Sequence, residues 1–148
     1  MTTTLRSPDA VVIPIGHHTL CVFALEPLLV HIRFEGDVTL DEARSLSHLV
    51  AKNIDGRGAR FLVDAAALGT ICQDSRRELV RAGPELLPGN SARVLDIVIV
   101  GASLLQKVVL TQIVTMASLR PESRGQTHFF DALEDALAWL GLPAQLLA

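Results

Sequence analysis

The chain has 148 residues, 49% of them hydrophobic, and a formal net charge of −3. This length is enough for one domain with a substantial core. With five Phe, one Trp and no Tyr, the chain has few aromatic side chains on which bases could stack, and no overall positive charge to attract phosphates. We therefore expect no nucleic-acid binding.

The cysteines and the N-terminal region indicate a cytoplasmic protein. Cys21 and Cys72 form no cluster with histidines at metal-ligand spacing, so we expect two reduced thiols and no metal site. His17 and His18 are adjacent residues of a predicted turn, and we expect both to be exposed loop residues. The first apolar run is interrupted by Pro14 and Gly16, which argues against a signal peptide and against a transmembrane segment.

The N-terminal third of the chain predicts three strands. Two β-favouring runs, 11–15 and 20–25, are separated by a four-residue loop and predict a hairpin. Residues 28–38 alternate between apolar and polar side chains, which indicates a half-buried strand. His31 falls on the polar side of this pattern, so we expect it to face solvent.

The middle of the chain predicts a helix, a strand and a second helix. Thr39 and Glu42 form a capping box at the start of a helix that runs to about Ile54. The apolar run 61–63 predicts a buried strand that ends at Asp64, followed by a bridge of small residues. Residues 73–75 then begin a helix, whose free N–H groups make an anion-friendly corner.

The last third predicts two more strands and two more helices. Residues 94–100 are almost all branched and apolar, as in a strand covered on both faces, and Asp96 needs a polar partner near its start. Ser103 and Gln106 form a capping box before a helix over about 104–119. A short strand over 127–130 precedes a final helix, for which Asp131 and Glu134 predict the N-terminal cap.

The helix over 104–119 is apolar around most of its circumference, whereas a surface helix ordinarily has one apolar face. The sequence leaves three explanations open. The helix provides a homodimer face, or it lines a groove for a small apolar ligand or lipid, or the N-terminal hairpin and the tail 142–147 cover it. For the first two explanations the candidate residues are Leu105, Val109, Ile113 and Met116.

The motifs of common enzyme classes are absent from the sequence. There is no phosphate-binding glycine loop, no nucleophile elbow and no nucleophile beside a histidine base. We therefore expect no cofactor and no enzymatic activity.

The order of these elements forms a pattern that includes the pieces Phe61-Leu-Val-Asp64, Leu68-Gly69-Thr-Ile71, Val98-Ile-Val-Gly101-Ala102 and Phe129-Phe130-Asp131. This pattern resembles the STAS/SpoIIAA-like superfamily, in its uncharacterised STAS/SEC14-type branch. The resemblance covers about residues 28–140. It implies an α/β fold in one domain, with a core over about 10–141 and a mixed sheet of five or six strands flanked by about four helices.

The resemblance also implies a non-enzymatic regulatory module that works by protein–protein contact. In the anti-sigma-factor antagonists of the superfamily, a partner kinase phosphorylates a serine of a D-S-S-G motif. Asp74-Ser75 matches the first step of that motif, and arginines stand where the second serine and the glycine would be. Ser75 is therefore either a phosphoacceptor or an ordinary first-turn residue, and the two arginines either pair with a phosphate or lie on a solvated helix face.

The partner loop that the resemblance implies comprises Asp64, Gly69, Thr70, Asp74, Ser75, Arg76 and Arg77. The implied partners are a second copy of the chain in a homodimer, and a kinase or an anti-sigma-like protein. The alternative function is that of a SEC14-like domain that binds a lipid or another small apolar ligand.

Overall fold

The structure is a computed structural model that describes residues 9–55, 57–86, 94–117 and 126–147. The first half consists of β1 (Ala10–Ile15), β2 (His18–Phe23), β3 (Leu28–Val38), α1 (Leu40–Ile54) and β4 (Ala59–Ile71). The second half consists of α2 (Gln73–Leu86), β5 (Val94–Val100), α3 (Leu104–Ala117), β6 (Gln126–Phe130), α4 (Leu133–Trp139) and a short 3-10 helix, η2 (Ala144–Leu147).

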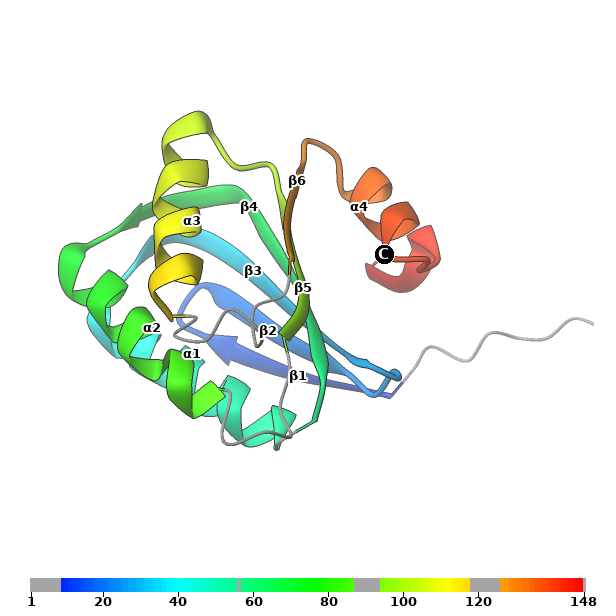
Figure 1. Cartoon of the computed structure of the whole chain (residues 1–148), viewed down its shortest axis with the longest axis horizontal. Helices are drawn as coiled ribbons and strands as arrows, with labels where there is room; N and C mark the ends of the chain where they lie inside the picture. The colour runs from blue at the N-terminus through cyan, green and yellow to red at the C-terminus, as the bar shows by residue number, and fades with distance from the viewer. Residues whose placement is uncertain (1–8, 56, 87–93, 118–125, 148) are drawn as a thin grey trace, which may run out of the picture.

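The six strands form one mixed sheet in the order in which they occur along the chain. β1, β2 and β3 pair antiparallel, and β3, β4, β5 and β6 pair parallel. Each parallel step needs a crossover, and crossovers of one hand that step in one direction place their helices on the same face of the sheet. Accordingly α1, α2 and α3 cover one face, whereas α4 lies on the other side beyond β6 (Figure 1). The predicted mixed sheet with four helices is confirmed.

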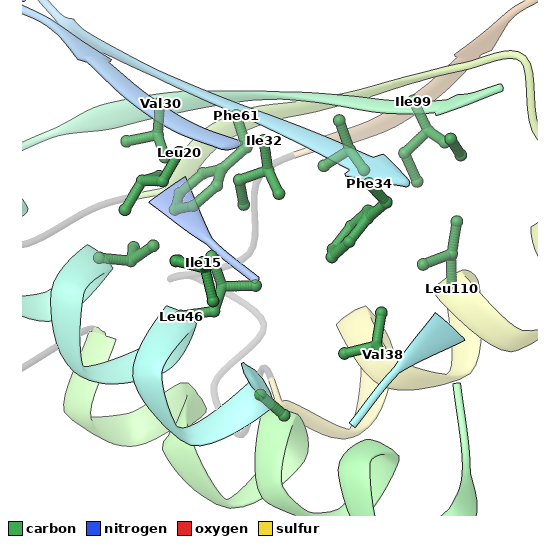
Figure 2. Close-up of a cluster of buried hydrophobic side chains, with 14 of the residues drawn as sticks. Ile15, Leu20, Val30, Ile32, Phe34, Val38, Leu46, Phe61, Ile99 and Leu110 are labelled. Carbon is green, nitrogen blue, oxygen red and sulfur yellow. The ribbon is translucent and has the colours of Figure 1, made fainter. Parts of the chain in front are cut away.

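Two apolar clusters fill the two faces of the sheet. The larger one joins Ile32 and Phe34 of β3 to Leu46 of α1 and Leu110 of α3 (Figure 2). The smaller one joins Leu29 of β3 and residues of β4 and β5 to the inner side of α4. Because β3 contributes to both clusters, it is covered on both faces.

The prediction that His31 faces solvent is therefore wrong. The residue is only 8% exposed, and its Nε2 has no hydrogen-bond partner among the described residues. Burial lowers the pKa of His31, and this effect outweighs the opposite influence of Asp64. Alternation along one strand could not reveal this, because it does not show whether the polar side of the sheet is covered.

The predicted hairpin is confirmed, but its turn is shorter than expected. Ile15 pairs with His18, so only Gly16 and His17 lie in the turn, and Gly16 supplies the positive φ of 61° that tight hairpin turns require. His18 thus belongs to β2 and is 3% exposed. The expectation that it is an exposed loop residue is wrong, whereas His17 is exposed.

The predicted strand end at Asp64 is also wrong, since β4 continues to Ile71. Its pairing with β3 extends to the pair Val38 and Ile71, with two register shifts on the way. Pairing with a long neighbouring strand thus overrides the weak β-propensity of the small residues after Asp64. Gly69 fits this extension because an added Cβ would lie 2.9 Å from the backbone carbon of Gly36 and would clash with Asp37.

Two of the three predicted helix caps are confirmed. The Thr39 hydroxyl accepts from the N–H of Glu42 at 3.2 Å, and the Glu42 carboxylate accepts from the N–H of Thr39 at 3.0 Å. The Ser103 and Gln106 pair makes the same two bonds. The third cap is wrong, since Ala132 is the N-cap of α4 and makes no side-chain capping bond; residues 118 and 119 of the predicted third helix lie outside the described residues.

Two further expectations concern the partner of Asp96 and the position of the C-terminal tail. Asp96 lies near the start of β5, is partly buried and has its Oδ1 3.8 Å from Nε2 of His128. The tail residues Leu142, Leu146 and Leu147 pack with α4 on the far face of the sheet. The tail therefore does not cover α3, which corrects the third explanation offered for that helix.

Candidate functional site

The outward side of α3 is largely apolar and carries no charge. Leu104 is 80% exposed, Leu105 73%, Val108 51% and Met116 61%. The other exposed residues between 104 and 116 are Thr111, Gln112 and Thr115. At 3.6 residues per turn these seven positions cover roughly 140° of the helix. A largely apolar surface that lacks charged residues is typical of the core of an interaction site.

Polar and apolar contacts hold α3 in this orientation. Leu110 lies on the opposite side of the helix, is 8% exposed and packs into the larger core cluster. Nε2 of Gln106 donates to the carbonyl oxygen of Leu68 at 2.7 Å, and Nζ of Lys107 lies 5.7 Å from the centre of the Phe129 ring. These contacts leave the exposed side of α3 facing away from the sheet.

A groove runs between α3 and α2. One hollow of about 410 Å³ is lined from α3 by Val109, Ile113 and Met116, and from α2 by residues that include Arg76 and Arg77. A second hollow of about 240 Å³ extends toward Gly69 and Thr70 and is bordered by Leu105. Both hollows have Arg76 and Val109 in their walls, so they adjoin.

The structure thus brings the two sets of candidate residues together. The apolar set Leu105, Val109, Ile113 and Met116 forms one wall of the groove. Gly69, Thr70, Arg76 and Arg77, which the resemblance placed in a partner loop, form the other wall and one end. Val80 and Arg81 also line the groove, although they were not expected from the sequence. Their spacing of one helical turn from Arg76 and Arg77 is the signal that could have revealed them.

The arginines along α2 differ in their partners. Arg77 lies 3.9 Å from Asp74, and Arg81 forms a close ion pair with Glu78 at 2.6 Å. Arg76 forms no ion pair within the described part of the chain, and its Nε is buried without a hydrogen-bond acceptor there. Arg76 therefore places a guanidinium group without a carboxylate partner at the point where the two hollows meet.

Ser75 is fully buried at the start of α2. Its hydroxyl donates to the carbonyl oxygen of Val38 at 2.9 Å, and its Oγ lies 3.0 Å from the sulfur of Cys72. Because the single hydroxyl proton is directed at Val38, the Cys72 thiol is the donor in the second contact. The bond to Val38 ties α2 to the end of β3, so in this conformation the hydroxyl is not accessible to another protein.

Asp37 and Thr70 close the end of the groove near Gly69. Oδ1 of Asp37 accepts from the N–H of Thr70 at 2.7 Å and from its hydroxyl at 2.8 Å. The N–H of Thr70 is the main cause that lowers the pKa of Asp37. Asp74 is exposed on the first turn of α2, and neither it nor the buried Ser75 lines either hollow.

Asp64 lies in the interior of β4, beside Arg33 of β3 in the sheet register. Its Oδ1 accepts from the N–H of Ala66 at 3.1 Å. Asp64 is on the strand face that carries Leu62, whereas the groove lies over the opposite face. We therefore exclude Asp64 from the candidate site.

The described residues contain no group of three or more His, Cys, Asp and Glu side chains that could hold a metal ion. In the same part of the chain, no helix is long and apolar enough to span a membrane.

Comparison with known proteins identifies the family. The family model described as SpoIIAA-like matches residues 29–141, which is most of the chain. The chain belongs to the SpoIIAA-like family. A solved structure of an uncharacterised protein with a SpoIIAA-like fold from Shewanella loihica is similar to this SpoIIAA-like chain, with a TM-score of 0.55 and 17% identity over 95% of this chain and 98% of that one. No curated protein matches the chain.

The match confirms the superfamily assignment made from the order of the sequence elements. At 17% identity the Shewanella structure supports the fold alone. The SpoIIAA-like fold makes this chain a STAS-like domain, and its particular role has to be argued from its own surface.

Proposed function

We propose that this SpoIIAA-like chain is a non-enzymatic regulatory module that acts by protein–protein contact. Its contact surface is the exposed side of α3 together with the end of β4 and the start of α2, over residues 69–77. The observation that carries the proposal is the uncharged face of α3, on which Leu104 and Leu105 are more than 70% exposed. A face of this kind gains free energy when a partner removes it from water, by about 25 cal/mol for each Å² of apolar surface.

Three of the groups that could serve catalysis near this surface, Ser75, Thr70 and His18, have structural roles instead. The Ser75 hydroxyl is bonded to Val38, and the Thr70 hydroxyl is bonded to Asp37. The buried His18 bonds to Asp37 and Glu42. These bonds favour an interaction module over an enzyme, since a nucleophile needs a base and access to substrate.

Regulation by phosphorylation would require α2 to open at its first turn. A phosphate on Ser75 carries a charge of about −1.5 to −2, and the described site is fully buried. We propose that residues 69–77 contact a kinase or an anti-sigma-like partner as a surface, with Thr70 and Arg77 exposed and Ser75 holding the surface in place.

Site-specific photo-crosslinking tests the proposal. A photoreactive residue at position 105, introduced into the protein in its native cell, should give a discrete crosslinked protein. The same residue at position 33, on the opposite face of the sheet, is the matched control and should give none. Loss of the crosslink on Met116→Glu would support the α3 face, and equal crosslinking from positions 33 and 105 would contradict it.

A second candidate function is the binding of a small apolar ligand or lipid. The hollow of about 410 Å³ beside Val109, Ile113 and Met116 is within the size range of small-molecule sites. Native mass spectrometry separates the possibilities. A homodimer would assign the α3 face to a second copy, a retained lipid-sized mass would support the ligand candidate, and a bare monomer would favour a different protein as partner.

A further inference from the structure

We propose that the groove between α2 and α3 binds an amphipathic helix of another protein, and that this helix presents a carboxylate to Arg76. The inference rests on the proposed interaction function and specifies the chemistry of the partner. Three features of the groove support it: its charge, its shape and its openness.

The charge of the groove favours an anionic group on the partner. Arg76 has no ion-pair partner among the described residues, and its buried Nε lacks an acceptor. A buried donor left without an acceptor is costly, and guanidinium groups bind carboxylates through paired, charge-assisted hydrogen bonds. α3 has no acidic residue from Leu104 to Ala117, so the helix that faces Arg76 across the groove cannot supply the carboxylate.

The shape of the groove suits a helix. Leu105, Val109 and Met116 follow one another at intervals of four and seven residues along α3, which is the spacing of a ridge that interdigitates with another helix. From Leu105 to Met116 the ridge extends for roughly 16 Å, at 1.5 Å per residue. Three turns of a partner helix therefore fit along it, with apolar side chains at helical spacing toward the groove.

The openness of the groove distinguishes a protein segment from a small ligand. Small-molecule sites enclose most of the surface of the ligand. Here the two ends of the ridge, Leu105 and Met116, are 73% and 61% exposed. Met116 lines only the larger hollow and Leu105 only the smaller one, so a small ligand in either hollow would leave one end of the ridge in water, whereas a helix lying along the ridge covers both ends.

A second copy of the chain would not satisfy Arg76 at this groove. A two-fold interface places the same surface on both partners. The described lining of the two hollows contains no acidic residue, and the nearby Asp74 and Glu78 of α2 already lie beside Arg77 and Arg81. A different protein with an acidic residue beside its apolar face fits the groove better.

A displayed library of helical peptides tests the inference. The peptides are about 16 residues long, with apolar side chains at one face and random residues at the flanks, and they are selected on the whole protein. We expect Asp or Glu to be enriched at one flank. The best peptide should bind Arg76→Gln about tenfold more weakly than wild type, which is the loss expected for one charge-assisted pair.

The matched control is Arg33→Gln, which removes a guanidinium group from the opposite face and should leave the affinity within about twofold. Selected peptides without acidic enrichment, equal binding to Arg76→Gln, or no selected peptide at all would each overturn the inference. A homodimer or a lipid that disappears on Val109→Glu would also overturn it. If the crosslink from position 105 persists in Arg76→Gln, the proposed interaction function stands and only the carboxylate contact is wrong.

Discussion

Nε2 of His18 lies 3.3 Å from Oε1 of Glu42, and this contact joins the first hairpin to the first turn of α1. Nδ1 of the same ring accepts from the N–H of Glu35 at 3.0 Å, so the proton of the neutral ring is on Nε2. That proton is shared between Glu42 and the carbonyl oxygen of Asp37 at 3.2 Å. The N–H of Thr39 is the main cause that lowers the pKa of Glu42, and His18 adds to it.

Replacement of His18 by Ala should destabilise the protein by about 2–3 kcal/mol, because it removes the buried ring to which the N–H of Glu35, the carbonyl oxygen of Asp37 and the Glu42 carboxylate are bonded. His17→Ala is the matched control, since His17 is the exposed neighbour in the turn and its loss should change stability by less than about 0.5 kcal/mol. Urea unfolding followed by the fluorescence of Trp139, the single tryptophan, measures both. Equal midpoints for the two variants would show that the network contributes little.

Replacement of Ser75 by Asp should destabilise the protein by about 3 kcal/mol or more, because it places an unpaired charge in a fully buried position. Ser75→Ala should cost about 1 kcal/mol through the loss of the bond to Val38. Gln73→Asp adds the same charge at an exposed position of the first turn, where the helix dipole favours it. A lower melting temperature for Gln73→Asp than for Ser75→Asp would contradict the buried position of Ser75.

Substitutions of two leucines of α3 should distinguish the side of the helix that packs into the core from the side that is exposed. Leu110→Ala should cost about 2–4 kcal/mol, since Leu110 is 8% exposed and packs against the sheet. Leu105→Ala should change stability by less than about 0.5 kcal/mol, because that side chain is 73% exposed. Chemical denaturation of the purified variants measures both, and a large cost for Leu105→Ala would mean that its side chain is covered.

The stability of the protein should fall as the pH is lowered below about 6.5, the usual pKa of histidine. Burial lowers the pKa of His31 in the folded state, so the unfolded chain binds the proton more readily than the folded protein does. Protonation at lower pH therefore favours the unfolded state. His31→Leu should reduce the difference between urea midpoints at pH 7.5 and pH 5.5. The exposed His48 provides the control variant His48→Leu, and an equal reduction in that variant would assign the pH dependence elsewhere.

Local patterns in the sequence were enough to predict most elements and their order along the chain. The bounds of β3 and β5 follow from runs of apolar residues between turn signals, and the caps of α1 and α3 follow from Thr39 with Glu42 and Ser103 with Gln106. These features depend on residues that are close in the chain, so their physical causes can be read from the sequence. The apolar excess of α3 was also visible in the sequence, but the sequence left open whether a second copy, a ligand or other segments of the chain cover the helix.

Tertiary structure decided which polar residues are buried and which charges meet. His18 and His31 are buried because β2 and β3 lie inside a sheet that is covered on both faces, and β4 extends past Asp64 because β3 offers it a longer neighbour. Arg76 meets Val109 only because the crossovers place α2 and α3 side by side on one face. Sequence alone thus determined the elements and their apolar faces, whereas pairing between distant segments determined the environment of each polar group, since burial and charge depend on neighbours that the local pattern does not contain.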